Sequence, residues 1–76
     1  NIAKYYFRME ILKTLRQQRR SKNISLSQAG EMLAEYEGRK KPYTSQYMSY
    51  LENADNVSLQ TVLKYAHILG MYIIVK

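Results

Sequence analysis

A short polar segment, TSQYMSYLEN at positions 44–53, carries the side chains of this 76-residue chain that are best placed to recognise a ligand. Positions 45 and 49, and positions 46 and 50, are four residues apart, so each pair shares one face of a helix. The resulting stripe displays hydroxyl, amide and phenol groups: Ser45, Gln46, Ser49 and Tyr50. These groups donate and accept hydrogen bonds without carrying charge, which suits the reading of a ligand's hydrogen-bonding edge.

The sequence contains no set of residues that could perform catalysis. It has no cysteine, a single histidine at position 67 and no convergent pair of carboxylates. A nucleophile, a base and an orienting group therefore cannot be assembled. We expect no enzyme, no metal site and no cofactor, and we expect His67 to have a packing or surface role.

Positive charge is concentrated ahead of the polar stripe. Twelve Lys and Arg oppose six Asp and Glu, giving a formal net charge of +6, and the excess lies within residues 1–43. Arg39, Lys40 and Lys41 directly precede the polar segment. A one-sided basic surface suggests a polyanionic partner, most commonly nucleic acid. The alternative is a charge excess that serves only solubility.

Hydrophobic periodicity predicts an all-α fold and one domain over residues 1–76. Apolar residues recur every three or four positions in four stretches, the pattern of helices that bury one face. The predicted helices cover about 3–22, 26–36, 45–53 and 59–69. Residues 37–42 contain the only proline and are predicted to be a loop. On the last helix, the expected inward residues are Leu59, Val62, Leu63, Ala66 and Leu69.

Capping residues mark the predicted helix ends. Three helices follow a residue whose hydroxyl can accept a first-turn amide: Ser25, Thr44 and Ser58. Gln28 stands three residues after Ser25 and completes a capping box. Asn23 and Gly70 are suited to left-handed helix stops. Gly30 lies inside a predicted helix, where its small size suggests that another helix crosses closely.

The chain ends in an apolar segment that predicts a strand at about 71–75. Its residues are Met71, Tyr72, Ile73, Ile74 and Val75. A lone strand leaves its backbone groups unpaired, so it needs a partner. The economical partner is the same strand of a second copy, which gives a homodimer with a two-stranded antiparallel ribbon. The alternative is an irregular tail packed on the first helix.

Three segments together resemble the xenobiotic-response-element (XRE), Cro/cI-like family of helix-turn-helix DNA-binding proteins. They are NISLSQAGEML at 23–33, YTSQYMSYLEN at 43–53 and SLQTVLKYAHILG at 58–70. The resemblance implies a lambda-repressor-like domain of four to five helices, with 45–53 as the recognition helix. The apolar ending is similar to the HipB-type antitoxin branch, whose C-terminal strand pairs across a dimer.

Three features depart from the family pattern. The connection between Leu33 and Tyr43 is longer than the family's usual turn. Leu26 stands where the family often has a phosphate-binding glutamine, and Ala54 stands where it commonly has glycine.

The resemblance also implies roles for individual residues. Bases would be contacted by the polar stripe, and Gln46 is the best candidate for a bidentate pair with adenine. Tyr50 would contact either a thymine methyl group or a phosphate. The expected phosphate contacts are Thr44, Tyr47, Arg39, Lys40 and Lys41. Arg19 and Glu52 match positions that hold a salt bridge in the family. The remaining basic residues near the end of the first helix are expected to form a solvated face: Arg16, Arg20 and Lys22.

The expected function is sequence-specific repression of transcription by a homodimer on a palindromic operator of double-stranded DNA. An antitoxin-like autoregulator with a toxin protein as a further partner is the favoured subtype. The alternative is a protein-interaction module that neutralises a toxin or scaffolds a complex, with DNA binding secondary. The longest apolar run, 71–75, is too short to span a bilayer, so we expect no membrane partner. The family resemblance implies a cytoplasmic protein of a bacterial or phage system, associated with the nucleoid when bound.

Overall fold

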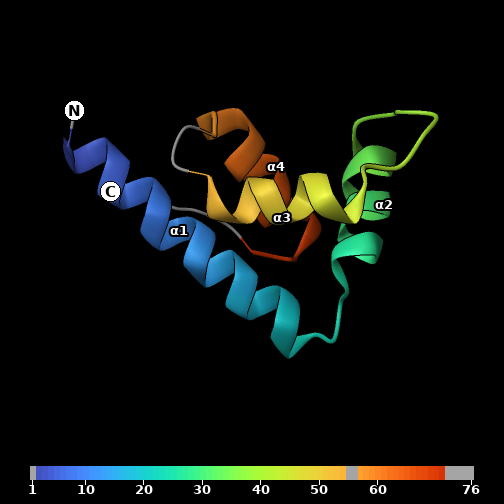
Figure 1. Cartoon of the computed structure of the whole chain (residues 1–76), viewed down its shortest axis with the longest axis horizontal. Helices are drawn as coiled ribbons and strands as arrows, with labels where there is room; N and C mark the ends of the chain where they lie inside the picture. The colour runs from blue at the N-terminus through green and yellow to red at the C-terminus, as the bar shows by residue number, and fades with distance from the viewer. Residues whose placement is uncertain (1, 55–56, 72–76) are drawn as a thin grey trace.

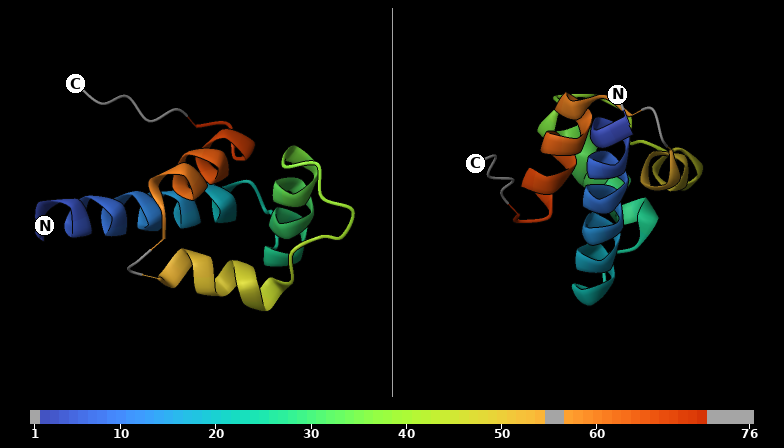
Figure 2. Two further views of the ribbon diagram at one scale, coloured as in Figure 1. Left: turned by 90° about the horizontal axis from the view of Figure 1, so that it is seen from above. Right: turned by 90° about the vertical axis from the view of Figure 1, so that its left-hand side faces the viewer.

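The computed structural model describes residues 2–54 and 57–71, with the side chains of the first helix described from Glu10 onward. These residues form four helices: α1 (Ile2–Ser21), α2 (Leu26–Tyr36), α3 (Ser45–Asn53) and α4 (Leu59–Ile68). The long α1 extends beyond the other three, and α2 stands beside the start of α3 (Figure 1). Two further views show α3 and α4 on opposite sides of α1 (Figure 2). No helix in this part of the chain is long and apolar enough to cross a membrane.

The all-α prediction is confirmed for the described residues, which contain no strand. Of the predicted strand at 71–75, only Met71 is described; it has no regular secondary structure and packs against the core. The other four positions, 72–75, lie outside the described residues.

Local capping sets the helix ends as the sequence predicts. The Ser25 hydroxyl accepts the Gln28 amide at 3.0 Å, and the Gln28 side chain accepts the Ser25 amide at 2.8 Å, which completes the capping box. Thr44 and Ser58 accept first-turn amides of α3 and α4. Asn23 has a φ of 57°, the left-handed conformation that reverses the chain after α1.

The end of α4 is capped by its own backbone and by a lysine that directly follows α1. Gly70, with a φ of 76°, donates to the His67 carbonyl, and Met71 donates to the Ala66 carbonyl at 2.9 Å. These two bonds form a Schellman motif. The Lys22 ammonium donates to the Leu69 carbonyl at 2.8 Å. Lys22 is exposed, as expected for a solvated face, and its cation also binds a helix C-terminus.

One core joins the four helices. Its buried residues are Leu12, Leu15, Ala29, Leu33, Met48, Leu51, Val62, Tyr65, Ala66 and Leu69. Two of the five inward residues predicted for α4 are instead exposed, Leu59 by 48% and Leu63 by 42%. The large ring of Tyr65 is fully buried and turns the inward face of α4 away from these two leucines.

Gly30 faces both the backbone that leads into α3 and a side chain of α3, so the predicted close approach of another helix is confirmed. The Tyr43 amide donates to the Gly30 carbonyl at 3.3 Å, and a Cβ at Gly30 would overlap the Tyr43 carbonyl oxygen. It would also lie 3.3 Å from the Met48 Cγ. The glycine therefore lets the start of α3 approach α2 more closely than any other residue would allow.

Arg19 and Glu52 form a buried ion pair that connects the helices. The Arg19 Nε donates to Glu52 Oε2 at 2.6 Å, and Nη2 donates to Oε1 at 3.2 Å. Nη1 donates to the Ile24 carbonyl at 2.8 Å, and the Tyr65 hydroxyl donates to Glu52. The salt bridge implied by the family resemblance is confirmed. A tyrosine from α4 adds a hydrogen bond to its carboxylate.

The close approach at Gly30 predicts that Gly30→Ala destabilises the fold by about 1–3 kcal/mol, although alanine favours a helix interior by about 1 kcal/mol. Urea unfolding would measure the change, with Ser27→Ala on the exposed side of α2 as the matched control. An unchanged or raised midpoint for Gly30→Ala would show that the Tyr43 backbone yields easily.

The ion pair predicts that Glu52→Ala costs about 3–5 kcal/mol, because the Arg19 charge is left buried without its partner. Replacing the three groups together, as Arg19→Met, Glu52→Leu and Tyr65→Phe, should recover most of this loss. Denaturant unfolding measures the stability of the single and the triple variant. As a control, Glu35→Ala on the exposed face of α2 should change stability by less than about 0.5 kcal/mol. A triple variant as unstable as Glu52→Ala would contradict the argument.

Candidate nucleic-acid interface

The outward face of α3 carries the predicted polar stripe. Met48, Leu51 and Glu52 are buried, so the opposite side of the helix faces solvent. Ser45, Gln46 and Tyr50 are exposed, and Ser49 is half-buried. The four residues expected to contact bases therefore lie on one accessible helix, with Gln46 and Tyr50 farthest from the core. Their placement follows from which residues α3 buries.

Three tyrosines form a row along α3 that the sequence analysis did not find. The rings of Tyr43 and Tyr47 stack with centroids 4.8 Å apart, and the Tyr47 and Tyr50 centroids are 6.4 Å apart at 39°. We call Tyr43, Tyr47 and Tyr50 the aromatic row. The Arg39 guanidinium lies 3.9 Å from the Tyr43 ring centroid and extends the row into the loop by a cation–π contact. Partial burial raises the pKa of Tyr47, so its hydroxyl stays protonated.

Glu37 anchors the aromatic row to α4. The Tyr43 hydroxyl donates to Glu37 Oε1, and the Lys64 ammonium donates to Oε2 at 3.1 Å. The Tyr43 hydrogen bond, followed by the Lys64 contact, lowers the pKa of the Glu37 carboxyl, against the opposing effect of desolvation. No spacing in the sequence indicates this contact, because it depends on how the loop at 37–44 folds back.

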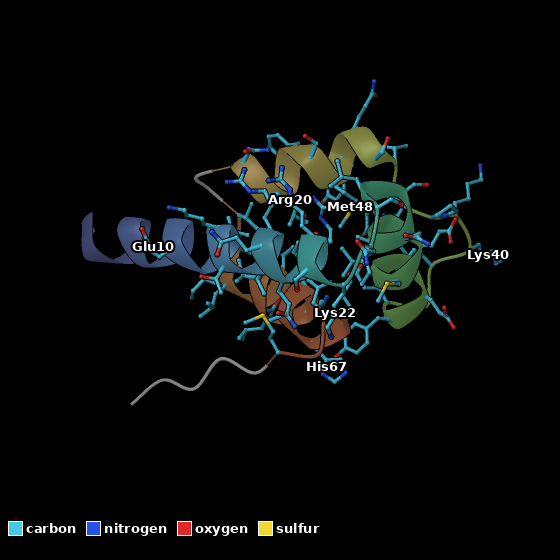
Figure 3. All side chains as sticks on the ribbon, turned by 90° about the horizontal axis from the view of Figure 1, so that it is seen from below. Glu10, Arg20, Lys22, Lys40, Met48 and His67 are labelled. Carbon is cyan, nitrogen blue, oxygen red and sulfur yellow. The ribbon has the colours of Figure 1, made fainter. Side chains whose placement is uncertain are left out.

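The basic loop places its three cations differently. Arg39 is held at both ends, since its amide donates to the Ala34 carbonyl at 2.9 Å and its guanidinium covers Tyr43. Lys40 and Lys41 are exposed, and Figure 3 shows Lys40 at the far side of the loop, away from the helices. Of the phosphate contacts predicted in this loop, the arginine is thus held in place, and the two lysines are exposed. Thr44 is exposed at the start of α3, and Tyr47 is 39% exposed.

A second basic region lies at the other end of α3. The Arg16 Nη1 donates to Asn53 Oδ1 at 3.1 Å, and Asn53 donates to the Ser49 carbonyl. Arg20, one turn further along α1, is exposed on the side that faces α3 (Figure 3). Arg16 is half-buried and, beyond the solvated face expected for it, contacts α3. Cationic side chains therefore lie at both ends of the uncharged stripe.

His67 packs its ring on Tyr36, with centroids 4.9 Å apart. This contact agrees with the packing or surface role expected for it. Among the described side chains, those of residues 10–54 and 57–71, no group of three or more His, Cys, Asp or Glu is placed to hold a metal ion.

Comparison with protein-family models, curated proteins and solved structures found no match to this chain. Its function is therefore argued from the residues and the geometry described above.

The Glu37 contacts predict a pH-dependent contribution to stability. Because the pKa of Glu37 is lower in the folded protein, its contribution is present above the unfolded value of about 4.3 and is lost as the pH falls through the folded pKa. Glu37→Gln should cost about 1 kcal/mol at pH 7. The gap in stability between wild type and variant should narrow as the pH falls below the unfolded value.

Urea unfolding between pH 3 and pH 7 checks this expectation. The exposed residue Glu31 on α2 offers a matched control, and Glu31→Gln should track the wild type across this range. A gap that stays constant down to pH 3 would show that the Glu37 charge does not act through Tyr43 and Lys64.

Proposed function

We propose that this chain is a sequence-specific DNA-binding repressor whose recognition helix is α3. The observation that carries the proposal is the separation of neutral hydrogen-bonding groups from cationic groups around α3. An uncharged hydrogen-bonding face points outward, and cationic side chains lie at both of its ends: Arg39, Lys40 and Lys41 at one, Arg16 and Arg20 at the other. Base edges are read by neutral hydrogen-bonding groups, whereas phosphates are held by cations.

The dimensions of B-DNA support this use of α3. The major groove is about 12 Å wide and accepts one α-helix. With the outward face of α3 on the base edges, the two basic regions would meet the phosphates that border the groove. The α2–α3 pair would act as a helix-turn-helix, with the Gly30 and Tyr43 backbones in contact where that motif brings its helices together.

Gln46 is the main candidate for base specificity. It is exposed in the first turn of α3, and its amide can form two hydrogen bonds with the N6 and N7 of adenine. Ser45 and Ser49 can each donate or accept, so they would contribute less discrimination.

We further propose that the protein binds as a homodimer and regulates its own expression as an antitoxin-like repressor. The support is the resemblance to XRE proteins and the apolar segment 71–75, which predicts a strand that needs a partner. A dimer would recognise an inverted repeat whose half-sites lie about 34 Å apart or a multiple of that distance.

Selection of binding duplexes from random DNA, followed by titration at several salt concentrations, tests the proposal. We expect an inverted repeat in the selected sequences. Gln46→Ala should lose about 1–3 kcal/mol of discrimination at one position of each half-site and leave the salt dependence unchanged.

Lys40→Ala serves as the matched control, because loss of a phosphate contact should weaken binding to all sequences and lower the salt slope by about 1. Binding that is uniform across sequences, or absent at moderate salt, would overturn the repressor proposal. That result would favour the protein-interaction module.

A further inference from the structure

The outward face of α3 has two chemically different edges. Ser45 and Ser49 lie on one edge, Tyr47 and Tyr50 lie on the other, and Gln46 lies between them. The aromatic edge is accessible, since Tyr47 is 39% and Tyr50 is 58% exposed. A shallow hollow of about 180 Å³ adjoins it. The hollow is bordered by Tyr47, Tyr50, Leu51, Val57, Ser58 and Thr61. Hydrogen-bond readout alone does not account for this apolar edge.

We propose that Tyr50, backed by Tyr47, reads the C5-methyl group of a thymine in the major groove. This inference rests on the proposed DNA binding and names a specificity determinant within it. The thymine methyl is the apolar group that a base pair presents in the major groove, and apolar side chains recognise it by contact. Cationic side chains lie at both ends of α3. They favour DNA, a polyanion, as the polymer that would bring a thymine methyl to this edge.

The position of Tyr50 favours a base contact over a phosphate contact. It stands four residues after Gln46 on the same stripe, and along the helix axis it lies between the two ends of α3. The cations lie instead at the two ends of α3, where the phosphates on either side of the groove would pass. A ring on the outward face, away from both ends of the helix, therefore meets base edges when the helix lies in the groove.

The aromatic row prepares this ring for contact. Tyr50 leans on Tyr47, Tyr47 stacks on Tyr43, and the Tyr43 hydroxyl is bound by Glu37. Each contact restricts the next ring along the helix, so Tyr50 loses less conformational freedom on binding than an isolated surface tyrosine would. Tyr47 and Tyr43 are positioning residues in this scheme, and Tyr50 makes the contact.

Replacing thymine by deoxyuridine in the selected duplex removes only this methyl group and provides the test. We expect one thymine in each half-site whose replacement weakens binding about fourfold, the effect of no longer burying one methyl-sized group. At the same position, 5-methylcytosine should bind more tightly than cytosine by a similar factor, since that pair also differs by one methyl group.

Variants assign the effect to Tyr50. Tyr50→Ala should bind the thymine and deoxyuridine duplexes equally, whereas Tyr50→Phe should keep the preference, because the ring makes the contact. Tyr36→Ala removes another exposed tyrosine, on α2, and should keep the full preference. Circular dichroism would establish that each variant is folded, and the wild-type deoxyuridine series requires no variant.

Two results would overturn the inference and leave DNA binding intact. One is a wild-type deoxyuridine series with no effect, while Gln46→Ala still relaxes base preference. The other is a Tyr50→Phe variant that weakens binding to all sequences alike, which would assign the Tyr50 hydroxyl to a phosphate. A selection that yields no preferred sequence would overturn the proposed function and this inference with it.

Discussion

The buried carboxylate of Glu52 is the group on which the arrangement of the helices depends. It accepts two hydrogen bonds from Arg19 of α1 and one from Tyr65 of α4, while it is itself part of α3. Burying an ion pair is costly unless its remaining donors and acceptors are also satisfied. Here Arg19 also binds the Ile24 carbonyl, and no buried side-chain nitrogen or oxygen among the described residues lacks a partner. The hydrogen bond to Glu52 also raises the pKa of Arg19, against the opposing effect of desolvation.

This carboxylate also decides what α3 shows to solvent. Glu52 points inward near the end of a nine-residue helix, which sets the rotation of α3 about its own axis. The start of the helix is held independently, by the contact of the Tyr43 backbone with Gly30 and by the Glu37 bond to the Tyr43 hydroxyl. With both ends held, Gln46 and Tyr50 face outward. A recognition surface built on a fixed helix spends little binding energy on ordering itself.

Cations of the chain lie around the outward face of α3 and not on it. The +6 of the chain could act as a diffuse field, yet several of its cations have defined positions. Lys22 closes the end of α4, Arg19 is buried, Arg16 holds Asn53, and Arg39 lies on Tyr43. The outward face of α3 itself stays uncharged. Cations at the ends of the helix and neutral groups along it suit a polyanion with readable edges better than they suit a uniform charged surface.

The amino-acid sequence determined by itself the features that depend on neighbouring residues. Helix bounds, the capping box at Ser25 and the left-handed turns at Asn23 and Gly70 all followed from local spacing, because a cap and its helix lie within a few residues of each other. The Arg19–Glu52 pair came from the family resemblance. Tertiary structure alone decided that Gly30 meets backbone and that Leu59 and Leu63 face solvent. It also decided that three tyrosines and Arg39 form a row anchored by Glu37. These outcomes depend on the path of the loop at 37–44 and on which large side chains occupy the core. Such long-range packing produces no periodic pattern in a single sequence.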